Sequence, residues 1–480
     1  MRSSRLQRSV LMIALAVAPL LADCRAAAPT PSGATSATPL SGSPFGLFYG
    51  LTPTGARPTA QYMVDLGAEW SRQTMFWNQI EPAPGRFQWA LLDGAAAIVD
   101  RAAGDGHQIN LMVTLRTASS WAGSTSVQGH AAAPPKDVHD YYEFVNAVVR
   151  RARGHIRYWQ IDNEIYSRGY WQGSADEYVR LLSTGYRAAK DADPDAQVVV
   201  AGIGAWLLPM LQDEIAAGHG DRALALYLSW AENNELAQGF PRPATVQDLQ
   251  RLMSRAGRLQ RQAEFVRRLL KKDSASHFDV LDLHIRHPYT IIPAVVEWAK
   301  NAMAREGYSR PIWISECSGP TYPELWPSDA VGERRQAEEV VKRYALALGS
   351  GAQRVFWTSL ATPRSLETVG EYSHEGLLRP DLSKRPAYGT YRLMTQMLKG
   401  ASAVRRLEFG HGVYGVQFTR PEGPVYVLWS DNGASVRLRA GPGHYMITDA
   451  FGSRSERDAA GEELELQLAS CPVFVQSAKR

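Results

Sequence analysis

Short apolar runs recur along most of the chain and alternate with longer stretches of helical periodicity. Runs of this length that are rich in β-branched and aromatic residues predict buried strands. Eight strands are expected, at residues 45–49, 69–75, 108–115, 157–161, 197–201, 278–284, 312–316 and 354–357. Because helix-length sequence separates each strand from the next, the pattern favours an α/β fold of the (β/α)8 TIM-barrel type over an open sheet.

The segments between the strands carry the apolar spacing of helices that cover a barrel. Ser174-Ala175-Asp176-Glu177 has the form of a capping box and predicts a helix start, and Asp193-Pro194 marks its end. Residues 206–274, rich in Leu, Arg and Gln, predict a helical insertion after the fifth strand. The other helices are expected near residues 60–66, 91–103, 141–152, 291–303, 337–348 and 385–398.

Both ends of the chain depart from this pattern. Residues 464–468 alternate apolar and polar side chains, and short β-rich runs separated by Gly, Pro and Asp surround them. This predicts a small antiparallel β-sandwich over residues 400–480, after a barrel over residues 43–399. Residues 26–42 are Ala, Pro, Ser, Thr and Gly and predict a disordered linker.

Residues 1–25 have the form of a signal peptide. Three arginines precede an apolar run over residues 10–21, which is short for a membrane span. Leu21-Ala22-Asp23-Cys24 resembles a bacterial lipoprotein box, except that Asp23 stands where a small residue is usual. Either lipidation of Cys24 attaches the chain to a membrane, or a signal peptidase cuts near residues 26–28. In both cases we expect an exported protein that is periplasmic, extracellular or membrane-anchored.

Composition narrows the class of protein further. The 480 residues are 45% hydrophobic and 21% charged, with a formal net charge of +4, so a large core is expected and nucleic acid is not indicated as a partner. The 13 Trp and 20 Tyr suit packing and the apolar faces of sugar rings. Besides Cys24 there are only Cys317 and Cys471, which we expect to be free and buried.

Two glutamates stand at the ends of predicted strands. Glu164 closes the run Trp159-Gln160-Ile161-Asp162-Asn163-Glu164, and Glu316 closes Ile312-Trp313-Ile314-Ser315-Glu316. A carboxylate next to an apolar strand is costly to desolvate, and in a barrel the carboxyl ends of the strands carry the chemistry. A pair of such carboxylates is what glycoside hydrolysis requires, one as acid and one as nucleophile or base.

The roles of the two glutamates follow from their neighbours. Glu164 is the better acid candidate, since Trp159, Tyr166 and Trp171 could shield it from water. Glu316 is the nucleophile candidate and must stay ionised, so it needs cations or hydrogen-bond donors nearby.

Six residues are predicted to bind substrate or to support the carboxylates. Asn163 could donate to a sugar hydroxyl, and Trp357 could form an aromatic floor. Arg72, His284 and Tyr289 could supply the donors for Glu316, and Trp77 is among the aromatic residues that could line a sugar subsite.

These residues resemble glycoside hydrolase clan A. The pair Asn163-Glu164 and the later Glu316 match the acid/base and nucleophile positions of that clan, and Trp357 and Lys384-Arg385-Pro386-Ala387-Tyr388 extend the likeness. The layout is most similar to family 39 and its bacterial exopolysaccharide-associated relatives, from about residue 45 to the C-terminus. The resemblance implies a retaining glycosidase that acts on a polysaccharide or oligosaccharide without a metal or organic cofactor. It also implies carboxyl groups about 5–5.5 Å apart.

One residue departs from that pattern. Relatives often place Tyr two residues after the histidine of the sixth strand, where this chain has Arg286. Either Tyr289 takes over the contact with the nucleophile, or the electrostatics of the site differ. An arginine at this place would depress the pKa of Glu316 further.

Other readings are weaker. Gly202-Ile203-Gly204 follows a strand, but Leu207 occupies the place of the third glycine of a dinucleotide site. The chain has no H-E-x-x-H, G-x-S-x-G or P-loop motif. A non-catalytic polysaccharide-binding or exopolysaccharide-assembly protein on a hydrolase scaffold stays open as the alternative. A decayed site of that kind should show carboxylates that point apart.

Overall fold

The computed structural model describes residues 29–49, 59–125, 131–232, 241–286, 288–319, 330–361, 375–410 and 412–478. The predicted signal peptide and Cys24 lie outside these residues. Among the described residues, no helix combines the length and the apolar character needed to cross a bilayer. Cys317 and Cys471 are free, as expected, but only Cys317 is buried and Cys471 is partly exposed.

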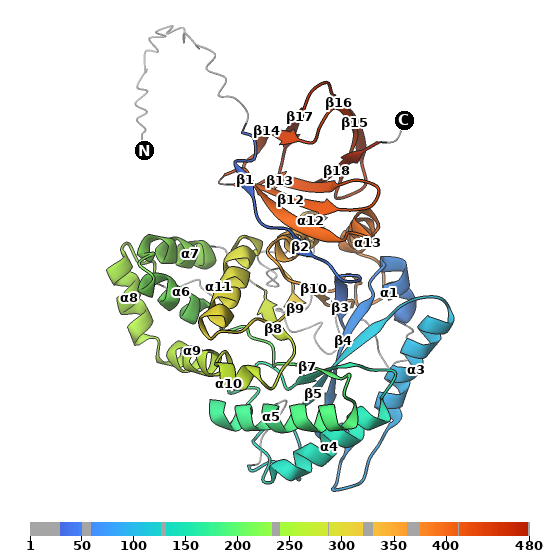
Figure 1. The fold of residues 1–480 in the computed structure, drawn as a ribbon, viewed down its shortest axis with the longest axis vertical. Coiled ribbons are helices and arrows are strands. Elements are labelled where there is room, and N and C mark those ends of the chain that lie inside the picture. The colour runs from blue at the N-terminus through green and yellow to red at the C-terminus, as the bar shows by residue number, and fades with distance from the viewer. Residues whose placement is uncertain are drawn as a thin grey trace, which may run out of the picture.

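The larger part of the chain is a barrel of eight parallel strands (Figure 1). Seven neighbouring pairs form a continuous parallel ladder in the order β7-β6-β5-β4-β3-β10-β9-β8, and the bridges Val199–Val280 and Ile203–Leu283 close it. The predicted α/β TIM barrel is therefore confirmed. Its strands are β3 (Phe45–Phe48), β4 (Trp70–Phe76), β5 (Asn110–Arg116), β6 (Tyr158–Ile161), β7 (Gln197–Val199), β8 (Leu281–Ile285), β9 (Ile312–Cys317) and β10 (Arg354–Thr358).

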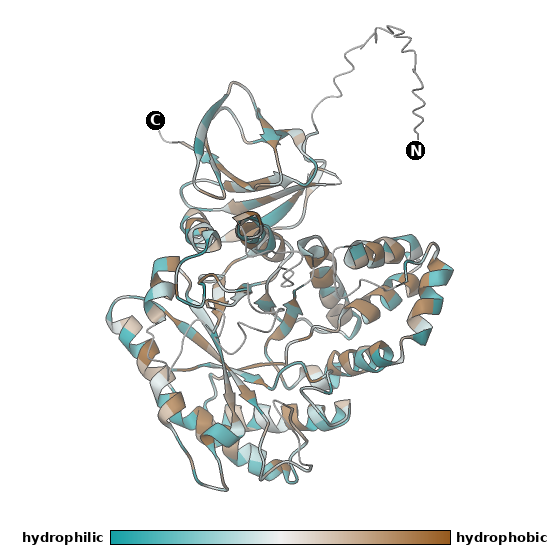
Figure 2. Ribbon diagram, turned by 180° about the vertical axis from the view of Figure 1, so that it is seen from behind, coloured by the Kyte–Doolittle hydropathy of each residue, from teal (hydrophilic) through white to brown (hydrophobic). Residues whose placement is uncertain are grey.

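Helices that carry both apolar and hydrophilic residues surround the strands (Figure 2). The predicted capping box is present: the Ser174 hydroxyl accepts from the Glu177 backbone N–H, and the Glu177 side chain accepts from the Ser174 backbone N–H. The main covering helices are α1 (Ala60–Leu66), α3 (Ala90–Gly104), α4 (Val138–Arg151), α5 (Ala175–Ala192), α11 (Ile292–Arg305), α12 (Ala330–Gly349) and α13 (Pro386–Leu398). Two short elements, α2 (Trp77–Ile80) and η2 (Tyr289–Ile291), follow β4 and β8.

The segment between β7 and β8 is helical, as its composition predicts. It contains α6 (Leu207–Ala216), α7 (Gly220–Glu232), α8 (Val246–Arg255), α9 (Gly257–Leu269) and α10 (Lys272–Ala275). These helices stand beside the barrel near α5 and α11 (Figure 1). The insertion therefore adds a wall next to the strands that carry Glu164 and His284.

The barrel interior changes from apolar to polar toward the carboxyl ends of the strands. One layer is an apolar cluster that includes Trp70, Met112, Val280 and Trp313. Two residues further along the same strands, side chains point to the same interior, because strand side chains alternate with a period of two. Those next positions are Arg72, Thr114, Asp282 and Ser315, all of them buried. The polar layer thus sits above an apolar floor.

The C-terminal part forms a separate antiparallel unit, as predicted. One sheet has the order β1-β11-β12-β13-β18-β15-β16, and β14 pairs with β17 in a second, two-stranded sheet. An apolar cluster that includes Leu428, Val436 and Leu466 fills the space between them. The strands are β11 (Ala403–Glu408), β12 (Val413–Thr419), β13 (Val425–Ser430), β14 (Ala434–Arg439), β15 (Gly443–Asp449), β16 (Arg454–Ala459), β17 (Glu463–Leu468) and β18 (Val473–Ser477).

The prediction of a disordered linker over residues 26–42 is wrong for the part that the structure describes. β1 (Gly33–Ala34) and β2 (Thr38–Pro39) both pair with β11. The Thr35 N–H donates to the Arg406 carbonyl at 3.0 Å, and the Thr35 hydroxyl accepts from the Arg406 N–H at 2.9 Å. Small and polar residues can complete a sheet edge because the backbone supplies the hydrogen bonds.

Candidate active site

Glu164 follows β6 on a turn that a buried ion pair holds. Asp162 and Glu164 have positive φ angles of 61° and 46°. The Asp162 carboxylate accepts from Arg116 Nε at 2.7 Å, from the Thr117 N–H at 3.1 Å and from the Asn163 N–H at 2.7 Å. These bonds join the end of β6 to the end of β5. The Asp162 turn therefore sets the direction in which Glu164 leaves the strand.

Glu316 reaches the interior through an irregularity between β8 and β9. The pairing register shifts between Leu283 and His284, so that Glu316 lies opposite His284. The Ser315 N–H donates to Asp282 Oδ1 at 3.0 Å, and the Ser315 hydroxyl donates to Asp282 Oδ2 at 2.5 Å. Local irregularities of this kind re-aim side chains. Here it directs two successive side chains, Ser315 and Glu316, toward the same set of polar groups.

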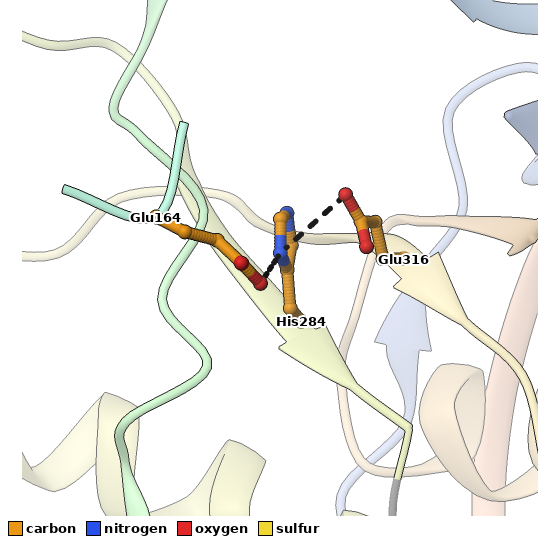
Figure 3. A group of neighbouring side chains, drawn as sticks. All are labelled: Glu164, His284 and Glu316. Carbon is orange, nitrogen blue, oxygen red and sulfur yellow. Dashed lines mark hydrogen bonds and ion pairs between the residues drawn. The ribbon is translucent and has the colours of Figure 1, made fainter. Parts of the chain in front are cut away.

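His284 lies between the two glutamates (Figure 3). Its Nδ1 is 2.8 Å from Glu164 Oε1 and 3.6 Å from Glu316 Oε1. One ligand atom from each of the three side chains lies within 4.8 Å of the others. Glu164 is the most accessible of the three, with 21% of its side chain exposed against 6% for Glu316 and 2% for His284. The two carboxyl groups thus converge on one place.

Arg72 ties Glu316 to the residue that precedes Glu164. Its Nη1 donates to Glu316 Oε1 at 2.6 Å, and its Nη2 donates to Asn163 Oδ1 at 2.6 Å. Its Nε donates to Gln160 Oε1 at 3.0 Å and to Thr114 Oγ1 at 3.1 Å. Arg72 is fully buried, and a planar guanidinium in this position fixes several acceptors at once. The structure therefore brings Arg72, Asn163, His284 and both glutamates together, as the sequence predicts.

Arg286 contacts the other oxygen of Glu316. Its Nη2 and Nε lie 2.6 and 3.2 Å from Glu316 Oε2, and its Nη1 donates to Glu375 Oε1 at 2.7 Å. Glu375 is 4% exposed and also accepts from the Ser318 hydroxyl at 3.2 Å. Arg286 stands where the pattern that the sequence resembles has a tyrosine. Because Arg286 itself contacts Glu316, the structure supports the alternative in which the electrostatics of the site differ. Sequence reasoning missed Glu375, which no strand-end pattern marks.

The electrostatic consequences differ among the buried groups. Burial by itself would raise the pKa of Glu316, but His284, Arg286 and Arg72 together hold that pKa well below its usual range. Burial by itself would lower the pKa of His284, but Glu316, Asp282 and Glu164 raise it to about 9. His284 is therefore protonated at neutral pH, and Glu316 is ionised.

Asp282 and Gln160 form the layer below the glutamates. Gln160 Nε2 donates to Asp282 Oδ2 at 2.6 Å, and His284 Nε2 lies 3.5 Å from the same oxygen. Both Asp282 and Gln160 are fully buried. Their hydrogen bonds connect β6, β8 and β9 through side chains. Asp282 could have been found from the sequence. It precedes His284 by two residues, so both side chains are expected on the same face of the strand.

The two glycines after β7 make room for the site. A Cβ at Gly202 would lie 1.9 Å from His284 Nε2, and one at Gly204 would lie 2.4 Å from the Tyr166 hydroxyl. Burial raises the pKa of Tyr166 well above its usual value, and the carboxylates of Glu164 and Glu316 raise it further, so its hydroxyl stays protonated and hydrogen-bonds to Glu164. Gly202-Ile203-Gly204 is thus a packing feature of this site rather than a dinucleotide motif.

Three predicted substrate contacts lie elsewhere or are covered. The Tyr289 hydroxyl donates to Asp431 in the C-terminal domain, so the expected contact with Glu316 is wrong. Trp77 is fully buried, donates to Glu81 Oε2 at 2.8 Å and packs on Phe144, which makes it a core residue. Trp357 is fully buried as well, and its indole N–H donates to the Glu375 carbonyl at 2.9 Å. Aromatic residues near strand ends serve as core and as binding residues alike, so the sequence does not separate the two.

Glu164, His284 and Glu316 also present a ligand set that distance alone would allow a metal ion to use. The charges argue against such an ion. Two guanidinium groups already bind the two oxygens of Glu316, and His284 Nδ1 is bonded to Glu164. A divalent cation would have to displace these partners. The donor set therefore fits proton transfer better than metal binding.

Several solved structures are similar to this chain. A family 39 glycoside hydrolase from the gut symbiont Bacteroides cellulosilyticus WH2 matches with a TM-score of 0.63 and 14% identity, over 92% of this chain and 81% of that one. A monomeric β-xylosidase from Caulobacter crescentus CB15 has a TM-score of 0.55 and 14% identity, with 92% and 97% covered. An α-L-arabinofuranosidase from Thermotoga maritima has a TM-score of 0.55 and 11% identity, with 94% and 99% covered.

No protein-family model matches the sequence. The structural likeness nevertheless extends over nearly the whole chain, through the barrel and the C-terminal β domain. At these identities what is shared is the fold. The chain has the fold of the family 39 glycoside hydrolases and related glycosidases, in agreement with the resemblance read from its sequence.

Proposed function

We propose that the protein is a retaining glycoside hydrolase that cleaves O-glycosidic bonds, most simply β bonds, of a polysaccharide or oligosaccharide. One observation carries the proposal: the two carboxylates converge, with one oxygen of Glu164 and one oxygen of Glu316 within 4.8 Å of each other. Retaining enzymes place their two carboxyl groups about 5–5.5 Å apart, whereas inverting enzymes leave room for a water. The fold shared with known glycoside hydrolases supports the same conclusion.

Glu316 is assigned as the nucleophile. Two arginines and a protonated histidine keep it ionised, and one carboxylate oxygen attacks the anomeric carbon as the bond to the leaving oxygen breaks. Glu164 is assigned as acid and then base: it gives its proton to the leaving oxygen, and later takes one from the water that hydrolyses the glycosyl ester. Its partial exposure allows it to reach a substrate oxygen.

The supporting residues have separate roles. Arg72 fixes Asn163 and Glu316 relative to each other through its two terminal nitrogens. His284 Nδ1 donates to Glu164 and orients the carboxyl group that must exchange protons. Tyr166 supplies a second hydrogen bond to Glu164. Positioning of this kind contributes to the rate because the reacting groups need no reorganisation in the transition state.

The alternative is a polysaccharide-binding or exopolysaccharide-assembly protein without catalysis. The observation that favours it is that both oxygens of Glu316 are engaged in ion pairs, with Arg72 and Arg286. The converging carboxylates favour the enzyme, since a binding site has no need of them.

Export by the N-terminal segment, with or without lipidation of Cys24, is part of either proposal. Incorporation of radiolabelled palmitate that is lost in Cys24→Ala would demonstrate lipidation.

The experiment compares wild type with Glu164→Gln and Glu316→Gln on a panel of β-linked glycans and purified exopolysaccharides. Glu297→Gln, on an exposed helix surface, is the matched control. We expect release of reducing ends by wild type and the control only, and a 2-fluoro glycoside should add covalently to Glu316. If all four proteins bind a glycan equally and none cleaves it, the hydrolase proposal is wrong and the binding-protein alternative takes its place.

A further inference from the structure

A cleft of about 790 Å³ lies beside the segment that directly follows the candidate acid, Glu164. One wall is the segment of residues 165–176 that follows Glu164, including Tyr166 and the first turn of α5. The opposite wall is α9 of the helical insertion. The cleft therefore lies between a catalytic loop of the barrel and an element added to it.

Arginines dominate the charge of this cleft. Arg168, Arg258, Arg261 and Arg268 line it, against the two acidic residues Asp176 and Glu264. Arg268 is already compensated, since it lies 2.6 Å from Asp176 and 3.0 Å from Asp273.

The other three arginines are exposed. Within the described part of the chain, the side chains of Arg168, Arg258 and Arg261 form no ion pair. With Glu264 as the remaining acid, the cleft keeps a positive excess.

Tyr166 connects the cleft with the chemistry. Its side chain lines the cleft, and its hydroxyl is hydrogen-bonded to Glu164. A Cβ at Gly204 would lie 2.4 Å from that hydroxyl and 3.5 Å from Glu164 Oε1. The Tyr166 hydroxyl and the Glu164 carboxylate therefore both lie close to Gly204, where no side chain separates them. A sugar in the cleft would therefore contact Tyr166, the residue whose hydroxyl is hydrogen-bonded to Glu164.

We propose that this cleft is a subsite for a sugar that carries an anionic group, so that the substrate is an acidic glycan. The inference rests on the proposed hydrolase. Guanidinium groups bind carboxylate and sulfate through paired N–H donors, and such charge-assisted bonds are stronger than bonds to neutral hydroxyls. Arg258 and Arg261 are three residues apart on α9 and so lie on neighbouring positions of one helix face. They are the pair that meets the anion.

The test measures binding separately from cleavage. Affinity electrophoresis in the Glu164→Gln background compares glucuronoxylan and oligomannuronate with the same polymers after carboxyl reduction, and dextran sulfate with dextran. The double variant Arg258→Gln/Arg261→Gln is compared with Arg255→Gln, which removes an exposed arginine of the same insertion outside the cleft. Circular dichroism checks that each variant is folded.

We expect at least tenfold tighter binding of one anionic polymer than of its neutral counterpart. The preference should be lost in the double variant, retained in Arg255→Gln, and weakened by 0.5 M NaCl. The anionic polymer that binds most tightly, carboxylated or sulfated, identifies the anionic group that the cleft recognises. Equal binding of charged and neutral polymers, no binding of any anionic polymer, or equal losses in the double variant and Arg255→Gln would each overturn the inference.

Reducing-end release by the protein with native Glu164 distinguishes the two proposals. Hydrolysis of neutral glycans without a charge preference would support the hydrolase proposal and contradict the acidic subsite. Charge-selective binding with no hydrolysis of any polymer would support the acidic subsite and contradict the hydrolase proposal.

Discussion

Arg286 donates to Glu316 Oε2 from Nη2 at 2.6 Å, on the side of the carboxylate opposite the oxygen that Arg72 holds. The pattern that the sequence resembles has a neutral tyrosine two residues after the histidine, whereas here a second cation lies against the candidate nucleophile. Glu375, behind Arg286, accepts from its Nη1 and compensates part of that charge. Glu316 is thus held in a more positive environment than the sequence resemblance implies.

Replacing Arg286 by Gln should make activity more sensitive to acid. A nearby opposite charge lowers a carboxyl pKa by about 1–3 units, so its loss raises the pKa of Glu316. Since the nucleophile must be ionised, the acidic limb of the kcat/KM profile should move to higher pH. The profile of each protein from pH 3 to 9 measures this, with Arg222→Gln, at an exposed ion pair, as control. An unchanged limb would show that Arg286 does not set this ionisation.

The two candidate catalytic glutamates should differ in their effect on stability. Glu316→Gln leaves two arginines without their buried partner, and breaking such a pair costs about 3–5 kcal/mol. Glu164→Gln removes a carboxylate that pairs with one cation, His284, and is itself partly exposed, so the loss should be smaller. Urea unfolding at pH 7 measures both free energies. Equal losses would show that the two arginine pairs of Glu316 add no more stability than the single pair of Glu164.

His284 should make stability depend on pH in the alkaline range. Its pKa is raised from 6.5 to about 9 in the folded protein. A raised pKa means that the stabilisation is fully present below the unfolded value of about 6.5 and is lost as pH rises through about 9. The difference in unfolding free energy between wild type and His284→Gln should therefore shrink by about 3 kcal/mol over that interval. A difference that stays constant between pH 6.5 and 9 would mean that His284 is already neutral in the folded state at pH 6.5.

Gly202→Ala should impair activity by displacing His284. The added Cβ would lie 1.9 Å from His284 Nε2, in a fully packed part of the barrel. Overpacking of this kind costs about 1–3 kcal/mol, and we expect kcat to fall by at least about tenfold because the imidazole orients Glu164. Gly389→Ala on α13 is the control, since its Cβ meets nothing within 4 Å. Steady-state kinetics and thermal unfolding of both variants provide the comparison.

The barrel and the location of its site could be predicted from local patterns. Each strand is short, apolar and followed by helix-length sequence, and this information is contained in neighbouring residues. Parallel strands all end at the same face of a barrel. Glu164 and Glu316, which are 152 residues apart in the chain, are therefore expected at one site together with Arg72 and His284.

Residues whose role depends on distant partners could not be assigned in the same way. Tyr289 follows β8 closely, yet its hydroxyl reaches Asp431 in a domain that begins more than a hundred residues later. Residues 33–39 have no strand pattern of their own, and they become strands because β11 offers an unpaired edge. Trp77 differs from a sugar-binding tryptophan only in what covers it.

The sequence by itself determined the order of strands and helices, the two glutamates and the cations available to them, because hydrophobic periodicity and strand ends are local properties. Only the tertiary structure decided which way Glu316 points. Counting by two from Trp313 places Ser315 inward and Glu316 outward. The register shift beside His284 turns Glu316 toward Arg72 and Arg286. Hydrogen bonds between Ser315 and Asp282 accompany that shift, and because the two residues lie on different strands, no single stretch of the chain contains this arrangement.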